Sequence, residues 1–164
     1  MPRCGSKWFV FLIKLMKGAG VMLIGEYKHG LDPKGRLIMP AKFREDIGSH
    51  FYVTIGTDKC LRAYPFEEWN HYKQRIEALP ESDAKARLYK RAIFSNSNEC
   101  EVDKQGRFLL ASNLKAYAGL EKDVVIIGQS SYIEIWSAEN WDAYNNMEDI
   151  NLDELITGLS DYGL

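Results

Sequence analysis

The chain has 164 residues, of which 46% are hydrophobic and 27% charged, and its formal net charge is −2. The apolar content is enough for a packed core and excludes wholesale disorder, while the small net charge gives no general attraction to nucleic acid. The three cysteines form no CxxC pair, which argues against a zinc site or a disulfide framework and fits a reducing compartment.

The first 21 residues differ from the rest of the chain. Residues 1–21 carry basic residues and no acidic one, and Trp8–Ile13 is an uninterrupted apolar run. This resembles the start of a secretory signal peptide, but Lys14 interrupts the run and only a poor small-residue cleavage site follows. The run is also too short to span a membrane. Because residues 17–19 can be encoded by a ribosome-binding sequence, we expect Met22 to be the native start and residues 1–21 to be a translated leader.

An internal repeat organises the rest of the chain. Residues 31–43 align with residues 102–114 at an offset of 71. Gly48 matches Gly119 at the same offset. After one inserted residue the offset becomes 72, which pairs Gly56 with Gly128, residues 61–64 with 133–136, and Trp69 with Trp141. Agreement at so many special residues indicates duplication of a unit of about 45 residues.

Both copies of the unit predict the same order of elements. Each begins with a short strand, a turn that opens on Asp, and a second strand. A short helix follows, with Pro40 at its opening turn in the first copy and Ser112 as its expected N-cap in the second. Gly48 and Gly119 are expected to end these helices. The other expected ranges are strands 36–39, 51–55 and 61–64 in the first unit, strands 107–110, 124–127 and 132–136 in the second, and closing helices from Phe66 and Ala138.

Helices are also expected between the units. Ser82 can cap a helix from Asp83 to about Phe94, which would form a hairpin with the helix at 66–78. Its basic face (Lys85, Arg87, Lys90 and Arg91) is typical of a solvated helix, or could pair with the acids of a neighbouring subunit. Residues 142–164 carry acidic residues and no basic one, and the tail is expected to be disordered or to form a short docking helix.

The expected organisation has five segments. They are a leader at 1–21, a first repeat with its closing helix at 22–78, a helical linker at 79–98, a second repeat with its closing helix at 99–146, and an acidic tail at 147–164. A unit of about 45 residues is too small to bury a core of its own. We therefore expect the two halves to share one core through a pseudo-two-fold axis, with strand exchange that leaves no open sheet edge.

The two Asp-initiated turns are the candidate functional sites. Asp32-Pro33-Lys34-Gly35 has the residues of a type I turn, and Asp103-Lys104-Gln105-Gly106 keeps Asp and Gly in the same places. The Asp side chain can accept from backbone N–H groups of the turn, and Gly allows positive φ. The next residue, Arg36 or Arg107, would lie opposite the Asp, where an ion pair would aim its guanidinium at phosphate or guanine. The same pattern also describes a well-made hairpin whose exposed ion pair contributes little.

At these residues the chain resembles the MraZ family, the duplicated member of the AbrB/SpoVT superfamily. The resemblance lies in residues 22–27, 31–44, 64–69 and 102–110 and covers about residues 22–145. It departs from the family pattern at Leu110-Ala111, where Ile-Pro is usual, so the second short helix lacks the opening proline that the first one has. Residues 1–21 have no counterpart in the family.

The resemblance implies a mainly β, α+β fold: a swapped-hairpin, double-psi-like barrel with linking helices. It also implies ring-like homo-oligomers in the cytoplasm, associated with the nucleoid, that bind direct repeats in double-stranded DNA upstream of a cell-division and cell-wall gene cluster. The expected DNA contacts are Lys34, Arg36, Lys104 and Arg107, and the expected orienting residues are Asp32, Gly35, Asp103 and Gly106. We expect Arg36 and Lys34 to contribute most.

Other chemistry finds little support in the sequence. His29, His50 and His71 lack metal-ligand spacing, and no phosphate loop or nucleophile elbow is present, so we expect no metal, no cofactor and no enzyme activity. Trp69, Trp136 and Trp141 are expected in the core or at subunit contacts rather than as base-stacking platforms. The alternative function is an adaptor or antitoxin-like module that uses the same barrel to bind a protein.

Overall fold

The two predicted repeats are present and have the same order of elements. The computed structural model describes residues 20–164. The first repeat contains β1 (Leu23–Gly30), β2 (Arg36–Ile38), α2 (Ala41–Ile47), β3 (His50–Ile55), β4 (Leu61–Pro65) and α3 (Phe66–Glu77). The second contains β5 (Ser97–Glu101), β6 (Arg107–Leu109), α5 (Ser112–Ala118), β7 (Asp123–Ser130), β8 (Ile133–Ser137) and α6 (Ala138–Tyr144). Between the repeats lies α4 (Ala84–Ser95), and after them α7 (Leu152–Gly158) and the 3-10 helix η1 (Ser160–Tyr162).

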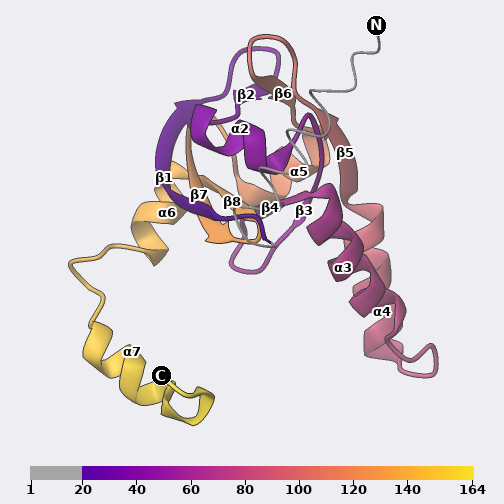
Figure 1. Ribbon diagram of the computed structural model, residues 1–164, viewed down its shortest axis with the longest axis vertical. Helices are drawn as coiled ribbons and strands as arrows, with labels where there is room; N and C mark the ends of the chain where they lie inside the picture. The colour runs from indigo at the N-terminus through magenta and orange to yellow at the C-terminus, as the bar shows by residue number, and fades with distance from the viewer. Residues whose placement is uncertain (1–19) are drawn as a thin grey trace, which may run out of the picture.

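The strands are exchanged between the repeats, as expected. One sheet has the order β1-β7-β8-β4-β3-β5, and β2 pairs with β6 in a separate ribbon. This order reads the same from either end when each strand is replaced by its counterpart, because β1 pairs with β7 of the other repeat and β5 pairs with β3. The pseudo-two-fold axis passes between β4 and β8, where Arg62 lies opposite Glu134. Figure 1 shows the strands curving into one barrel that α2 and α5 cover.

The two repeats share one main core. The main core cluster takes buried side chains from both, including Phe43 and Phe51 from the first and Phe108 and Leu114 from the second. Phe51 and Phe108 meet edge to face, with ring centroids 5.1 Å apart. Burying one such side chain stabilises a fold by about 1.5–3 kcal/mol, so the shared core ties the repeats together.

The sequence alignment of Gly56 with Gly128 is wrong by one residue. Ile55 lies opposite Leu61 in the β3–β4 pair, and Gly128 lies opposite Ile133, the counterpart of Leu61, in the β7–β8 pair. The structural counterpart of Gly128 is therefore Ile55. A β-carbon at residue 128 would collide with the backbone of Leu23 on β1, so glycine is required by a close approach between strands.

Two helix caps also differ from the prediction. Ser112 is the first residue of α5 rather than its cap; the preceding Ala111 makes no side-chain cap, and neither does Pro40 before α2. The second short helix thus starts at the position equivalent to the first, despite its missing proline. The cap of α4 is Asp83, whose carboxylate accepts from the backbone N–H of Lys85 at 2.8 Å, because Asp caps as well as Ser and stands one residue nearer the helix.

Helical segments project from the barrel on two sides (Figure 1). The hydroxyl groups of Tyr72 on α3 and Tyr89 on α4 lie 2.8 Å apart, so these helices form the expected hairpin. The tail contains the short helix α7. Among the described residues, no helix is long and apolar enough to cross a membrane. The expected leader lies outside the described residues, apart from residues 20 and 21.

Candidate functional site

The two Asp-initiated turns have the predicted hydrogen bonds. In the first, the backbone N–H of Gly35 donates to the carbonyl of Asp32 at 3.0 Å. Asp32 Oδ1 accepts from the backbone N–H groups of Lys34 and Arg36, each at 2.9 Å. The second turn repeats all three bonds with Asp103 as acceptor. The glycines have φ of +76° and +78°, the left-handed region that other residues avoid.

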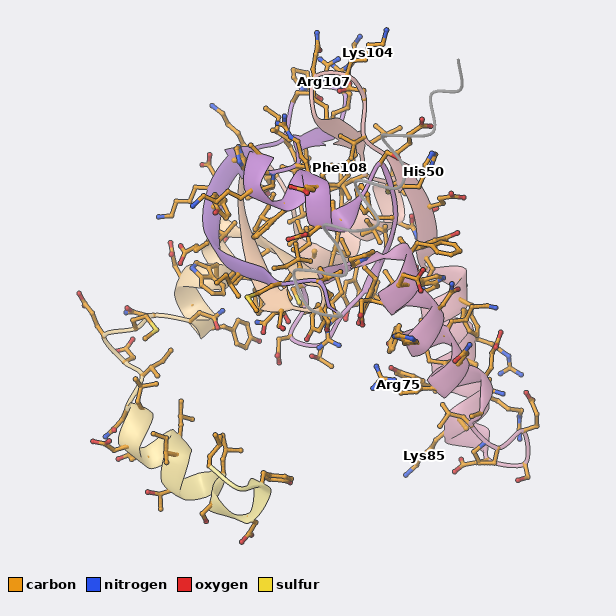
Figure 2. All side chains as sticks on the ribbon, viewed as in Figure 1. His50, Arg75, Lys85, Lys104, Arg107 and Phe108 are labelled. Atoms are coloured by element: carbon orange, nitrogen blue, oxygen red, sulfur yellow. The ribbon has the colours of Figure 1, made fainter. Side chains whose placement is uncertain are left out.

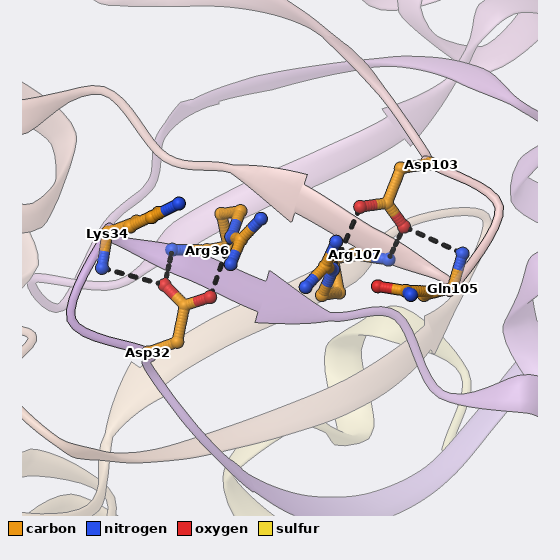
Figure 3. A network of polar contacts seen from close by, with 6 residues as sticks. All are labelled: Asp32, Lys34, Arg36, Asp103, Gln105 and Arg107. Atoms are coloured by element: carbon orange, nitrogen blue, oxygen red, sulfur yellow. Dashed lines mark hydrogen bonds and ion pairs between the residues drawn. The ribbon is translucent and has the colours of Figure 1, made fainter.

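Each turn aspartate also holds the following arginine. Arg36 Nε lies 2.6 Å from Asp32 Oδ2, and Arg107 Nε lies 2.8 Å from Asp103 Oδ2 (Figure 3). The backbone N–H bond from the arginine, together with its guanidinium, lowers the pKa of both aspartates. Both carboxyl groups are therefore ionised near neutral pH, and each one closes its turn and fixes the direction of an arginine.

The ribbon β2–β6 brings the two arginines onto one face. Arg36 lies opposite Leu109 and Arg107 lies opposite Ile38, so all four side chains share one face, while the alternate pair of Leu37 and Phe108 is buried. Figure 3 shows both guanidiniums projecting from the ribbon between the two aspartates. Leu109 is 61% exposed and Ile38 is 38% exposed. The outer face of the ribbon thus combines two aimed cations with two exposed apolar side chains.

The turn lysines lie beside this face but are not equivalent. Lys34 is the third residue of its turn and Lys104 the second of its own, and both are exposed. Figure 2 shows Lys104 at the outer tip of the barrel near Arg107, with Phe108 inside the barrel. All eight residues predicted as contacts or orienting groups therefore belong to two turns of one ribbon, at one end of the molecule.

Sequence reasoning missed two further basic residues at this end. Arg44 on α2 lies against Gly106, and Lys115 on α5 lies against Gly35, so each turn is covered by a cation from the other repeat. Arg44 is fixed, because its Nε donates to the carbonyl of Met39 at 2.9 Å. The internal repeat could have identified them, because Arg44 and Lys115 are 71 residues apart, which is the repeat offset.

Comparison with known proteins identifies the family of the chain. A model of the family described as "MraZ protein, putative antitoxin-like" matches residues 22–92 and again residues 93–156. The chain belongs to the MraZ family. The protein named Transcriptional regulator MraZ from Heliobacterium modesticaldum is 49% identical over 87% of this chain and 100% of its own length. The proteins of the same name from Desulforamulus reducens and from a Thermoanaerobacter species are 48% and 44% identical, over 85% and 87% of this chain and over 99% and 100% of their own lengths.

The remaining candidate residues of this MraZ-family chain are structural. Burial raises the pKa of the Cys60 thiol to about 12 and that of Cys100 to about 11, which makes both inert, as expected. Trp69 stacks on Tyr52, with ring centroids 5.1 Å apart, and Trp136 is buried, so neither ring is available for base stacking. Within residues 20–164, no group of three His, Cys, Asp or Glu side chains could hold a metal ion.

Proposed function

We propose that this protein is a transcriptional regulator that binds double-stranded DNA sequence-specifically through the β2–β6 ribbon. The observation that carries the proposal is the pair of aspartate-held arginines, Arg36 and Arg107, on the outer face of a two-stranded ribbon. The major groove of DNA admits a two-stranded ribbon, and Arg bidentate to guanine is the commonest specific contact there. The names of the relatives support the same function.

The ribbon offers chemistry for two kinds of base. Each ion pair uses Nε, and among the described residues no bond engages the terminal nitrogens of either guanidinium. Those nitrogens are left to donate to O6 and N7 of guanine, in a direction that the aspartate has already set. Leu109 and Ile38 lie beside them, and an apolar side chain is suited to the methyl group of thymine.

The lysines take a different role in this proposal. Lys34 and Lys104 are exposed at the turn tips, where a flexible ammonium group contacts phosphate and adds affinity without reading sequence. Because the whole chain carries a net charge of −2, the attraction to DNA must come from this local cluster. Repetition of the cluster in an oligomer multiplies the contacts that one barrel can make.

The family resemblance supplies the finer parts of the proposal. We propose that the protein forms a ring-like homo-oligomer and binds direct repeats upstream of a cell-division and cell-wall gene cluster, at the nucleoid in the cytoplasm. Subunits that follow one another head to tail present their ribbons in the same sense along the DNA. Such an arrangement matches direct repeats, whereas an isologous dimer would match a palindrome.

A protein-binding role is the second candidate. The antitoxin-like description of the family and the 61% exposure of Leu109 favour a ribbon that docks a protein partner. A gel-shift assay separates the two functions. It compares binding to DNA from upstream of the protein's own gene with binding to shuffled DNA of the same composition. DNA reading is supported if the protein prefers the upstream DNA and the double variant Arg36→Ala/Arg107→Ala loses this preference. The control variant Lys73→Ala, on the α3–α4 hairpin, should retain it. Equal binding of both DNAs by the unaltered protein contradicts it.

A further inference from the structure

The tail helix α7 exposes a continuous apolar stripe. Leu152, Leu155, Ile156 and Leu159 follow the i, i+3, i+4, i+7 spacing of one helix face, and each is between 40% and 59% exposed. Every residue from 151 to 164 is exposed, and Figure 1 shows α7 standing away from the barrel. An amphipathic helix normally buries such a stripe, so this face lacks its partner.

The charge of the tail defines what that partner must be. The tail carries Asp149, Asp153, Glu154 and Asp161 around the apolar stripe, and residues 142–164 contain no Lys or Arg. A complementary surface therefore has exposed apolar side chains that basic groups surround.

The helix α4 of the projecting hairpin has such a surface. Leu88 is 66% exposed, and Lys85 and Arg91 stand one turn away on either side of it. Neither cation forms an ion pair with another described residue, whereas Lys90 is paired with Glu81 at 2.6 Å. The centre of the exposed face of α4 is thus apolar and its flanks are positively charged. Figure 2 shows Lys85 at the far end of the hairpin, well away from the barrel.

We propose that α7 of one copy packs on α4 of a second copy, with its apolar stripe over Leu88 and its acids beside Lys85 and Arg91. The pseudo-two-fold axis explains why the partner is another copy. The hairpin follows β4 and the tail follows β8, and these two strands lie on opposite sides of the axis. The tail and the hairpin therefore leave the barrel on opposite sides (Figure 1), so contacts between copies repeat head to tail.

This contact is independent of the proposed reading of DNA, because assembly is measured without DNA. Two full-length variants test it: Leu155→Ser/Ile156→Ser in the tail, and Leu88→Glu in the hairpin. All three altered residues are more than half exposed, so the fold is retained, and circular dichroism checks this. Ile24→Ser on β1, at 63% exposure, is the matched control for removing an exposed apolar side chain.

Sedimentation velocity at micromolar concentration gives the readout. We expect each variant alone to lose the large assemblies of the unaltered protein, and Ile24→Ser to keep them. Mixing the two variants is the decisive step, because one retains its hairpin and the other its tail. A mixed complex holding one copy of each supports the head-to-tail contact.

Two results would overturn the inference. The first is that either variant forms assemblies of the same mass as the unaltered protein. The second is loss of assembly with no mixed complex, since the altered tail and the altered hairpin would then not be the two halves of one contact. If the mass of the tail variant is unchanged and its affinity for DNA rises, the acidic tail covers the basic ribbon instead.

Discussion

The turn glycines provide a quantitative test of how the two repeats interlock. Gly35 and Gly106 both have φ in the left-handed region, where a residue with a β-carbon costs roughly 1–2 kcal/mol. The two sites differ in what a β-carbon would meet. At residue 35 it would lie 2.5 Å from Nζ of Lys115, the free end of a flexible side chain. At residue 106 it would collide with the guanidinium of Arg44.

Arg44 cannot move without a cost. Its Nε donates to the carbonyl of Met39, and losing one such bond destabilises a fold by about 0.5–1.5 kcal/mol. We therefore expect Gly35→Ala to lower the free energy of unfolding by about 1–2 kcal/mol. Gly106→Ala should lower it by about 1.5–3.5 kcal/mol, because both costs apply.

Urea unfolding at one fixed protein concentration measures both values. Gly158→Ala at the end of α7 is the control, since no described atom lies within 4 Å of its β-carbon position, and we expect a change within about 0.5 kcal/mol. In an Arg44→Ala background the losses at residues 35 and 106 should become equal. An equal loss at both sites with Arg44 present, or a greater loss at residue 35, would refute the reasoning.

Three further predictions concern the turns, the thiols and the ribbon. Folding lowers the pKa of Asp32 and Asp103, so their contribution to stability is complete above the usual Asp pKa of about 3.9 and is lost as the pH falls below it. In the double variant Asp32→Asn/Asp103→Asn, the free energy of unfolding should therefore fall less steeply with acidification than in the unaltered protein. Cys60 and Cys100, whose pKa values are about 12 and 11, should react with a thiol reagent at pH 8 only after denaturation, in a Cys4→Ser background. Phe108→Ala removes a side chain that is 1% exposed and should cost about 3–5 kcal/mol in the same urea assay.

The duplication made most of this fold predictable from the sequence. Two copies of a unit too small for its own core imply a shared core, and the observed exchange of β1 and β5 between repeats follows from that. The turns were equally predictable, because Asp, Gly and Arg at fixed spacing specify a local hydrogen-bond pattern that needs no other part of the chain.

Contacts between distant segments could not be predicted in this way. The alignment failed at Gly128 because the reason for that glycine is the backbone of Leu23, more than 100 residues earlier. Arg44 and Lys115 were overlooked because each covers the turn of the opposite repeat, a neighbour that only the pairing of β2 with β6 creates. The exposed stripe of α7 has no local signal that distinguishes a docked helix from a free one.

Salt-dependent binding to DNA from upstream of the protein's own gene tests the central proposal most directly. A bidentate contact to guanine contributes about 1–3 kcal/mol, so Arg36→Ala should weaken specific binding by about 5- to 150-fold for each bound subunit and remove the preference over shuffled DNA. Lys34→Ala should weaken binding to both DNAs alike and reduce the slope of log K against log salt concentration by about one unit for each phosphate that the lysine neutralises. Thermal melts of both variants should match the unaltered protein within a few degrees. Specific binding that Arg36→Ala leaves unchanged, with its fold intact, would mean that the ribbon does not read DNA and that the aspartate–arginine pairs serve only to close the turns.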